Sequence, residues 1–219
     1  MEIHLKIFDS RDELSQALTE EMTFALFDGG SACLAGGSSP LQAYSLLARK
    51  CILPWERITL IPSDERCLPP GHDERNDTLL QRIFQKHQCK ILNLTSEEDF
   101  TVRSPLLDKN LPRYLPFRVT ILGLGEDGHT AGLFPGNPSL QAVSSLVEVS
   151  NSPKPPRERV SLSIKSLNRS EKIFFCVIGS SKRSALHSFL DGSDIPPSLM
   201  SPEGEVMIFA DREAAGSNT

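Results

Sequence analysis

The sequence predicts one α/β domain with a mostly parallel sheet and helices on both faces, a Rossmann-like arrangement. Strand-like apolar runs alternate with stretches of helical periodicity along most of the chain. The length of 219 residues suits one such domain, and 39% hydrophobic and 23% charged residues are ordinary values for a globular protein. We expect the domain to span residues 1–213 and residues 214–219 to form a flexible tail.

The first half of the chain alternates strands with helices. Residues 4–8 are a short apolar run, and Ser10 and Glu13 then have the spacing of a capping box that begins a helix. The small residues at 31–35 and the β-branched run at 57–62 indicate strands. The remaining elements expected here are helices at 41–49 and 76–87 and strands at 91–94 and 117–122.

The second half consists mainly of expected strands. They lie at 146–150, 160–164, 172–178 and 205–209, with a helix at 182–190. The longest apolar run, IFFCVI at 173–178, is far shorter than the ~18 residues of a membrane span. The N-terminal residues MEIHLKIFDSRDEL have alternating charge and no apolar core, so we expect no signal peptide and a cytoplasmic location.

Charge and cysteine content narrow the class of protein. Lys and Arg number 23 against 28 Asp and Glu, a net charge of −5, which argues against a broad basic surface for nucleic acid. A local cluster of cations can still bind a small anion. The five cysteines lack a CxxC motif and are interpreted as reduced thiols, and the five histidines lack HxxxH or HExxH spacing, so no metal site is expected.

The segment LAGGSSPLQAY, residues 34–44, follows a predicted strand. Gly36 and Gly37 allow close backbone approach, and Ser38 and Ser39 add hydroxyl donors, which together predict a phosphate cradle. The alternative is an ordinary tight turn from strand to helix. The segment lacks the lysine of a P-loop and the spacing of GxGxxG.

The segment PSDERC places Asp64, Glu65 and Arg66 directly after the strand at 57–62. Arg66 can present a planar fork to a phosphate, and the carboxylates can orient it or bind sugar hydroxyls. The alternative is a salt-bridged loop. A second DER, at residues 73–75, is interpreted as a solvated loop and helix start.

In the segment ILGLGEDGHTAGLFPG, residues 121–136, five glycines lie within the fourteen residues from 123 to 136. His129 can act there as a general base with Asp127 nearby, and backbone N–H groups of the turn can stabilise an oxyanion. The alternative is a loop histidine without a special role. Downstream, Lys154, Arg157 and Arg159 concentrate positive charge, which fits either an anionic partner or a solvated basic loop.

Together GGSSP, DER, LGLGEDGHTAGLFPG and PKPPRERVSLS resemble the family of 6-phosphogluconolactonases and glucosamine-6-phosphate deaminases, and its lactonase branch in particular. The resemblance implies the sheet type of sugar-phosphate isomerases and lactonases. It also implies a hydrolase that converts 6-phospho-D-glucono-1,5-lactone to 6-phosphogluconate in the oxidative pentose phosphate pathway. It further implies no metal or organic cofactor, no nucleic-acid or membrane partner, and a monomer or weak homo-oligomer.

The resemblance also assigns roles to residues. It makes His129 the base that activates water, with Asp127 assisting, and makes Asp64 a substrate contact or an orienting group. The substrate-binding residues implied are Gly36, Gly37, Ser38, Ser39, Arg66, Gly125, Gly128, Lys154 and Arg159. The departures from the family pattern are Gly132 in place of Ser, Arg157 in place of Pro, and Phe209 with Asp211 in place of a Trp–Asp pattern.

Three alternatives remain from the sequence. In the deaminase branch the motif DGHxA is followed by FNEP, whose Glu carboxylate helps ring opening. Here the chain reads Leu133, Phe134 and Pro135, so that carboxylate is missing. A non-catalytic sugar-phosphate sensor on the same fold is the second. The third concerns Cys67, which is either a redox control point activated by Arg66 or an inert, partly buried thiol.

Overall fold

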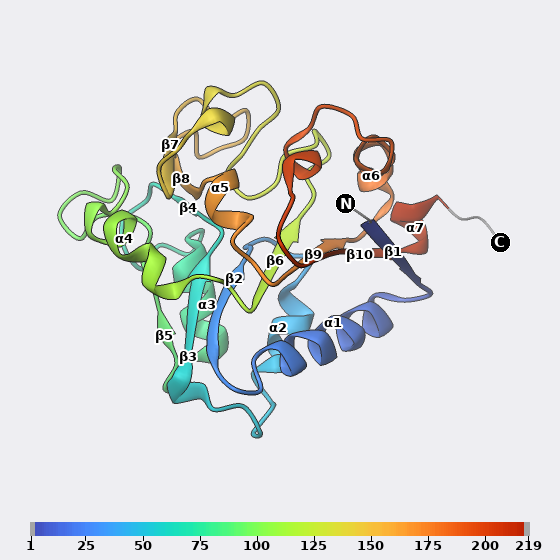
Figure 1. The fold of residues 1–219 in the computed structure, drawn as a ribbon, viewed down its shortest axis with the longest axis horizontal. Helices are drawn as coiled ribbons and strands as arrows, with labels where there is room; N and C mark the ends of the chain where they lie inside the picture. The colour runs from blue at the N-terminus through green and yellow to red at the C-terminus, as the bar shows by residue number, and fades with distance from the viewer. Residues whose placement is uncertain (1–2, 217–219) are drawn as a thin grey trace.

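The computed structural model describes residues 3–216, and a seven-stranded parallel sheet forms its centre (Figure 1). Its strands are β1 (Ile3–Phe8), β2 (Gly30–Leu34), β3 (Ile58–Pro62), β5 (Lys90–Ile91), β6 (Val119–Gly123), β9 (Lys172–Val177) and β10 (Glu205–Asp211). The order across the sheet is β1-β10-β9-β6-β2-β3-β5, and every neighbouring pair is parallel. The predicted fold class is confirmed.

The chain order creates a switch point between β2 and β6. From β2 the chain runs outward to β3 and β5, then returns to β6 on the other side of β2. The loops that follow β2 and β6 therefore leave the sheet in opposite directions and open a crevice at its carboxyl edge, the usual place for a ligand.

Helices cover both faces of this sheet. The helices are α1 (Arg11–Ala25), α2 (Leu41–Leu47), α3 (Asn76–Phe84), α4 (Pro105–Asn110), α5 (Ile164–Leu167), α6 (Arg183–Leu190) and α7 (Arg212–Ala215). Short 3-10 turns are η1 (Trp55–Arg57), η2 (Leu111–Tyr114), η3 (Pro138–Gln141), η4 (Ser180–Lys182) and η5 (Pro196–Leu199). The N-cap half of the expected capping box is confirmed at α1, where Ser10 Oγ accepts the N–H of Glu13 at 3.2 Å, whereas the Glu13 carboxylate accepts the N–H of Asp9 at 3.2 Å.

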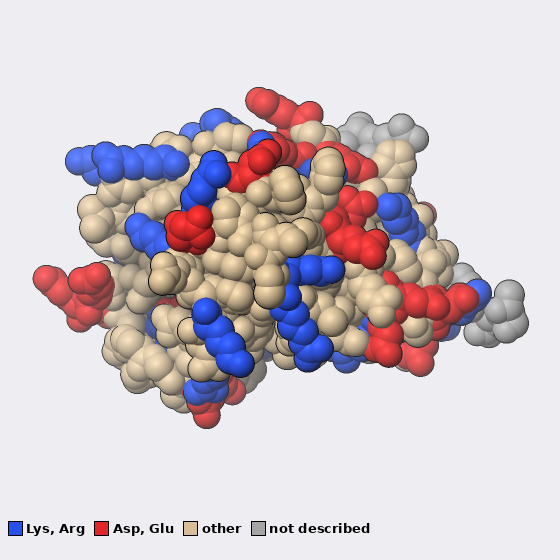
Figure 2. Space-filling model, turned by 90° about the horizontal axis from the view of Figure 1, so that it is seen from below, with Lys and Arg blue, Asp and Glu red and all other residues tan. Residues whose placement is uncertain are grey.

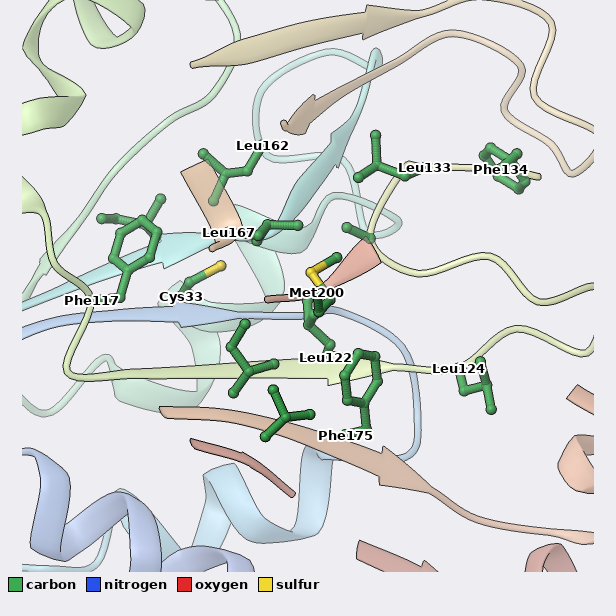
Figure 3. Close-up of a cluster of buried hydrophobic side chains, with 14 of the residues drawn as sticks. Cys33, Phe117, Leu122, Leu124, Leu133, Phe134, Leu162, Leu167, Phe175 and Met200 are labelled. Atoms are coloured by element: carbon green, nitrogen blue, oxygen red, sulfur yellow. The ribbon is translucent and has the colours of Figure 1, made fainter. Parts of the chain in front are cut away.

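Alternate residues of the central strands enter two separate cores. Leu34 of β2 packs with α1, α2 and α3, whereas Cys33 faces the other core with α4, α5, α6 and α7. Figure 3 shows this second core, where Cys33, Leu122 and Phe175 of the sheet face Leu162 and Leu167. Burial on both faces explains why these strands are continuous apolar runs.

A smaller antiparallel sheet covers part of the second core. Its strands are β4 (Asp64–Arg66), β8 (Arg159–Leu162) and β7 (Leu146–Val149), in the order β4-β8-β7. The strands expected at 146–150 and 160–164 therefore exist, but they are antiparallel and lie outside the main sheet. Residues 64–66, expected in a loop, form β4 because β8 offers a partner strand that is distant in sequence.

Two further boundaries differ from expectation. The strand expected at 91–94 is reduced to β5, Lys90–Ile91. Ala214 and Ala215, expected in a flexible tail, belong to α7 instead, because Asp211 Oδ1 accepts the N–H of Ala214 at 2.8 Å and caps this helix, and Ala214 is fully buried. The last part of the expected tail, residues 217–219, lies outside the described residues.

The surface carries charges of both signs. In the face shown in Figure 2, Lys and Arg side chains alternate with Asp and Glu, and no side-chain charge of one sign dominates. This face therefore carries no broad basic patch. Among residues 3–216, no helix has the length and apolar character needed to cross a membrane.

Candidate active site

A cavity of about 400 Å³ opens at the carboxyl ends of four neighbouring strands, β9, β6, β2 and β3. It is lined by Ala35, Gly36, Gly37, Ser38, Ser39, Pro40, Asp64, Arg66, Asn76, Gly123, Leu124, Gly125, Glu126, His129, Ala131, Arg159, Ile178, Ser181 and Lys182. All four segments singled out by sequence contribute to this lining, three of them because parallel strands end at the same edge of the sheet and the fourth through Arg159. Cavities of this size accommodate small molecules.

The loop after β2 presents main-chain donors to the cavity. Within residues 3–216, no acceptor takes the backbone N–H of Gly36, Gly37, Ser38 or Ser39. Gly37 has φ +82°, a left-handed conformation that glycine adopts without strain, and no atom lies within 4 Å of the place of a Cβ. Successive free N–H groups in a turn favour an anion.

The small sheet contributes two arginines to the same cavity. Arg66 of β4 and Arg159 of β8 are direct partners in the antiparallel register, so their side chains lie on one face. Like charges directly opposite destabilise a sheet unless an anion lies between them. Burial lowers the pKa of Arg159, and the positive charge of Arg66 lowers it further. The carboxylate of Asp64 acts in the opposite direction. Arg66 Nε is buried and has no hydrogen-bond partner within residues 3–216.

Asp64 lies beside this arginine pair, two residues before Arg66 on the same face of β4. Its Oδ2 is 3.6 Å from Arg159 Nη1, and Ser63 Oγ donates to its Oδ1 at 2.9 Å. The carboxylate partly compensates the two guanidinium charges. This contact gives a geometric basis for the prediction that Asp64 orients a substrate-binding partner, here Arg159.

Glu65 points to the opposite face of β4 and is fully buried. Its carboxylate accepts the backbone N–H groups of Arg66, Asn76 and Asp77 at 2.7–2.8 Å, which caps the start of α3. Burial, reinforced by the charge of Asp77, raises the pKa of Glu65 to about 7. The hydrogen bonds from the backbone N–H groups and the charge of Arg75 act in the opposite direction and are outweighed. Of the DER motif, Asp64 and Arg66 thus face the cavity and Glu65 holds the helix.

The interpretation of residues 73–75 as a solvated segment is wrong for Arg75. That side chain is 1% exposed and donates from Nε and Nη2 to the two oxygens of Asp77 at 2.9 and 2.6 Å. It also lies 3.9 Å from Glu65 Oε2. Arg75 is therefore part of the support beneath β4 and α3, whereas Asp73 and Glu74 are exposed as expected.

His129 and Asp127 form a hydrogen-bonded pair in the loop after β6. Asp127 Oδ1 is 2.5 Å from His129 Nδ1, and the ring packs against Phe134 with centroids 4.7 Å apart. The other ring nitrogen, Nε2, has no partner among the described residues, and His129 lines the cavity. Burial lowers the pKa of His129, an effect that Asp127 only partly offsets. Burial would raise the pKa of Asp127, but the hydrogen bond with His129 outweighs it.

The glycine-rich turn uses most of its N–H groups internally. The Gly125 N–H donates to the His129 carbonyl at 2.8 Å, and the Gly128 N–H donates to the Gly125 carbonyl at 3.0 Å. Gly132 donates to Ser161 Oγ at 3.1 Å, which ties the turn to β8. The expectation that this turn supplies an oxyanion site is therefore wrong for these donors, because their hydrogens are already bonded.

Gly128 does not line the cavity, contrary to expectation. It has φ +82° and is buried, and a Cβ there would lie 3.0 Å from Ile195. Its role is to let the turn reverse beneath Ile195. Gly125, in contrast, lines the cavity, and a Cβ at this position would lie 2.0 Å from His129 Nδ1 and 2.5 Å from Asp127 Oδ1.

Replacing Gly125 with alanine is expected to lower kcat at least about 10-fold, because the methyl group displaces the His129–Asp127 pair. Gly123→Ala, a matched change at the end of β6 and also in the cavity lining, adds a Cβ with no atom within 4 Å and should cost much less. Steady-state kinetics and thermal unfolding of both variants make the comparison. Equal loss of kcat in the two variants contradicts this prediction.

Lys154 also lies outside the cavity lining, although its charge still lowers the pKa of His129 and of Asp127. Its backbone carbonyl is bound by Ser152 Oγ at 2.9 Å, so the proline-rich loop folds on itself. Arg157 is exposed. Of the three cations in this loop, only Arg159 reaches the cavity.

Sequence reasoning missed Asn76 and the segment after β9. Ile178, Ser181 and Lys182 line the cavity, and Lys182 Nζ is 3.8 Å from Glu126 Oε1 across its rim. A signal existed, because the GSSK stretch follows the strand expected at 172–178 and so belongs to the same sheet edge. Asn76 had no comparable signal, since its position at the start of a helix says nothing about the cavity.

Metal and thiol chemistry find little support here. Among residues 3–216, no group of three or more His, Cys, Asp or Glu side chains is arranged to hold a metal ion. Burial, with the charge of Glu158, raises the pKa of Cys67 to about 11, so its thiolate is scarce at neutral pH. This favours the inert thiol over the redox control point.

The fold and the cavity define an α/β protein whose switch-point site combines a histidine–aspartate pair with anion-binding groups. The family model described as "Glucosamine-6-phosphate isomerases/6-phosphogluconolactonase" matches residues 9–209. The chain belongs to this family and is one of its enzymes.

Curated relatives and solved structures agree with that membership. A 6-phosphogluconolactonase of Synechocystis sp. is 30% identical over 202 residues, covering 84% of this chain and 83% of its own. One from Caulobacter vibrioides is 31% identical over 216 residues, 90% of either chain. A crystal structure of a 6-phosphogluconolactonase from Shewanella baltica has a TM-score of 0.84 at 25% identity, covering 96% of this chain and 98% of the other.

The fold alone does not separate the two activities of the family. The structure of a monomeric glucosamine-6-phosphate deaminase has a TM-score of 0.83 at 21% identity, covering 97% of this chain and 99% of that chain. This value is almost the same as that for the lactonase structure. The choice between the activities must therefore come from the site and from sequence relatives.

Proposed function

We propose that the protein hydrolyses 6-phospho-D-glucono-1,5-lactone to 6-phosphogluconate, as the names of its curated relatives suggest. The observation that carries the proposal is the arginine pair, Arg66 and Arg159, set across two strands in the cavity that His129 also lines. The pair suits an anionic group of the substrate, and His129 suits proton transfer at a reacting carbonyl.

In this proposal His129 is the general base. Its Nδ1–H donates to Asp127, which fixes the neutral tautomer with Nε2 as acceptor. Nε2 takes a proton from water, and the water oxygen bonds to the lactone carbonyl carbon. The tetrahedral intermediate then breaks the ring C–O bond, and His129 returns the proton to the leaving alkoxide. Water is consumed, and a carboxylic acid and an alcohol form.

The phosphate is assigned to the part of the cavity formed by residues 36–39 and the arginine pair. The free N–H groups of residues 36–39 and the arginine pair supply donors, and Lys182 adds a cation at the rim. Charge-assisted bonds of this kind hold a phosphate firmly and leave the lactone ring to be oriented against His129. Because a lactone is an activated ester, a positioned base suffices without a covalent nucleophile.

The proposed base predicts a pH profile. Since the pKa of His129 lies below 6.5, kcat/KM should stay at its plateau at neutral pH and fall only below that value. Asp127→Asn removes the charge that raises this pKa, so the acid limb should move to lower pH, and the plateau should drop about 10-fold or more as the tautomer is lost. Background-corrected rates between pH 4.5 and 8 test this, with Asp191→Asn on the exposed end of α6 as control. A limb that moves to higher pH contradicts the assignment.

The direct test uses purified protein and two substrates. Oxidation of glucose 6-phosphate in place generates the lactone, whose disappearance is compared with the protein-free rate. Ammonia release from glucosamine 6-phosphate tests the deaminase alternative. We expect acceleration of the first reaction only, and the reverse pattern would favour the deaminase. Cytoplasmic location, a role in the pentose phosphate pathway and a monomer or weak homo-oligomer remain predictions.

A further inference from the structure

Asn76, the first residue of α3, lines the cavity although it is only 3% exposed. Its side-chain Nδ2 donates to the backbone carbonyl of Asp64 at 2.7 Å and lies 3.4 Å from Asp64 Oδ1. One amide group therefore contacts both the main chain and the carboxylate of Asp64. The side chain has no part in the reaction proposed above.

The other end of the same amide fits against the loop after β2. A Cβ on Gly36 would lie 1.9 Å from Asn76 Oδ1, so the amide occupies the space that the missing side chain leaves. Asn76 thus fills the gap between the donor loop of residues 36–39 and strand β4.

The backbone of Asn76 is held from below by Glu65. The N–H groups of Asn76 and Asp77 each donate to a different oxygen of the Glu65 carboxylate at 2.8 Å. Arg75 pairs with Asp77 and is fully enclosed. The start of α3 therefore has a fixed position relative to β4, which fixes the reach of the Asn76 side chain.

Asp64 has two differently held oxygens. Ser63 and Asn76 contact Oδ1, whereas Oδ2 is directed at Arg159. Holding Oδ1 sets the rotation of the carboxylate and so the contact with Arg159. Buried polar networks in which every member is bonded give a unique arrangement of this kind.

The geometry points to Asn76 as a positioning residue for substrate binding, acting through Asp64 on the arginine pair. This inference rests on the proposed function. Asn76 makes no contact with His129 among its hydrogen bonds, so its loss should weaken ligand binding and raise KM with little effect on kcat.

A double-mutant cycle with Asp64 tests the inference. The readouts are the Kd of 6-phosphogluconate by calorimetry and the KM and kcat for the lactone. Asn76→Ala should weaken binding about 10-fold in the wild-type background. In the Asp64→Asn background the same change should have an effect of less than about twofold, because the carboxylate it positions has been removed. Multiplicative effects, or unchanged binding in Asn76→Ala, overturn the inference.

Controls separate positioning from folding and from failure of the proposed function. Asn93→Ala removes a matched side chain that accepts from Arg75 Nη2 at 2.9 Å in the same buried network but lies outside the cavity. It should lower Tm and leave Kd within about twofold. If Asn76→Ala does not fold, Asn76→Ser replaces it in the cycle. Wild-type protein that binds no 6-phosphogluconate refutes the proposed function, whereas normal binding with no response to Asn76 refutes only this inference.

Discussion

Replacing His129 with alanine is expected to lower kcat by about 10²–10⁴-fold, the usual contribution of a positioned general base. The expectation rests on a ring that lines the cavity, with Nδ1 engaged by Asp127 and Nε2 free within the described residues. KM should change little, because no phosphate-binding group touches the ring. Folding should persist, since His129 keeps part of its surface exposed.

The measurement is lactone disappearance after subtraction of the protein-free rate, which is appreciable for this substrate class. His187→Ala, on the exposed side of α6, is the matched control and should behave as wild type. Full turnover by His129→Ala would remove the base from the mechanism. Equal loss in both variants would instead indicate damage unrelated to the site.

Replacing Arg66 with alanine is expected to raise KM about 10- to 100-fold, the cost of losing charge-assisted hydrogen bonds. Arg66 lines the cavity, and its Nε is buried without a partner in the described part of the chain, which leaves it available to an anion. Arg66→Lys keeps the charge but not the planar fork and should give an intermediate KM. Since Arg66 is assigned to the phosphate and not to the proton transfer, kcat should fall much less.

Arg82→Ala provides the control for charge and for loop packing. Arg82 is exposed and pairs with Asp73, outside the cavity, so its loss should leave KM unchanged. Arg66 Nη1 also donates to the carbonyl of Glu74, so Tm is recorded for each variant. A large drop in kcat at constant KM in Arg66→Ala would contradict a binding role.

Much of the site was predictable because of one topological rule. The segments at residues 36–39, 64–66 and 125–129 follow β2, β3 and β6, which are neighbours in the sheet. Parallel strands gather such segments at one edge, so recognising the strands was enough to bring these segments together. The N-cap at Ser10 was equally local and was confirmed.

The parts that could not be predicted depend on partners distant in sequence. Strand β4 forms only because β8 lies beside it, and that pairing turns Glu65 away from the cavity while Arg66 and Arg159 face it together. Asn76 reaches the cavity only through the Glu65 cap of α3. The resemblance assigned Lys154 to substrate binding; Lys154 does not line the cavity, although its charge lowers the pKa of His129 and of Asp127.

The central claim is that one cavity joins a water-activating histidine to a phosphate-binding wall. Its most direct test is kcat/KM of the wild-type protein for 6-phosphogluconolactone and for glucono-1,5-lactone, which lacks the phosphate. The phosphorylated lactone should be preferred by about 100-fold or more, because the arginine pair and the donor loop bind only that group. Equal values for the two lactones, or no acceleration of either above the protein-free rate, would contradict the claim.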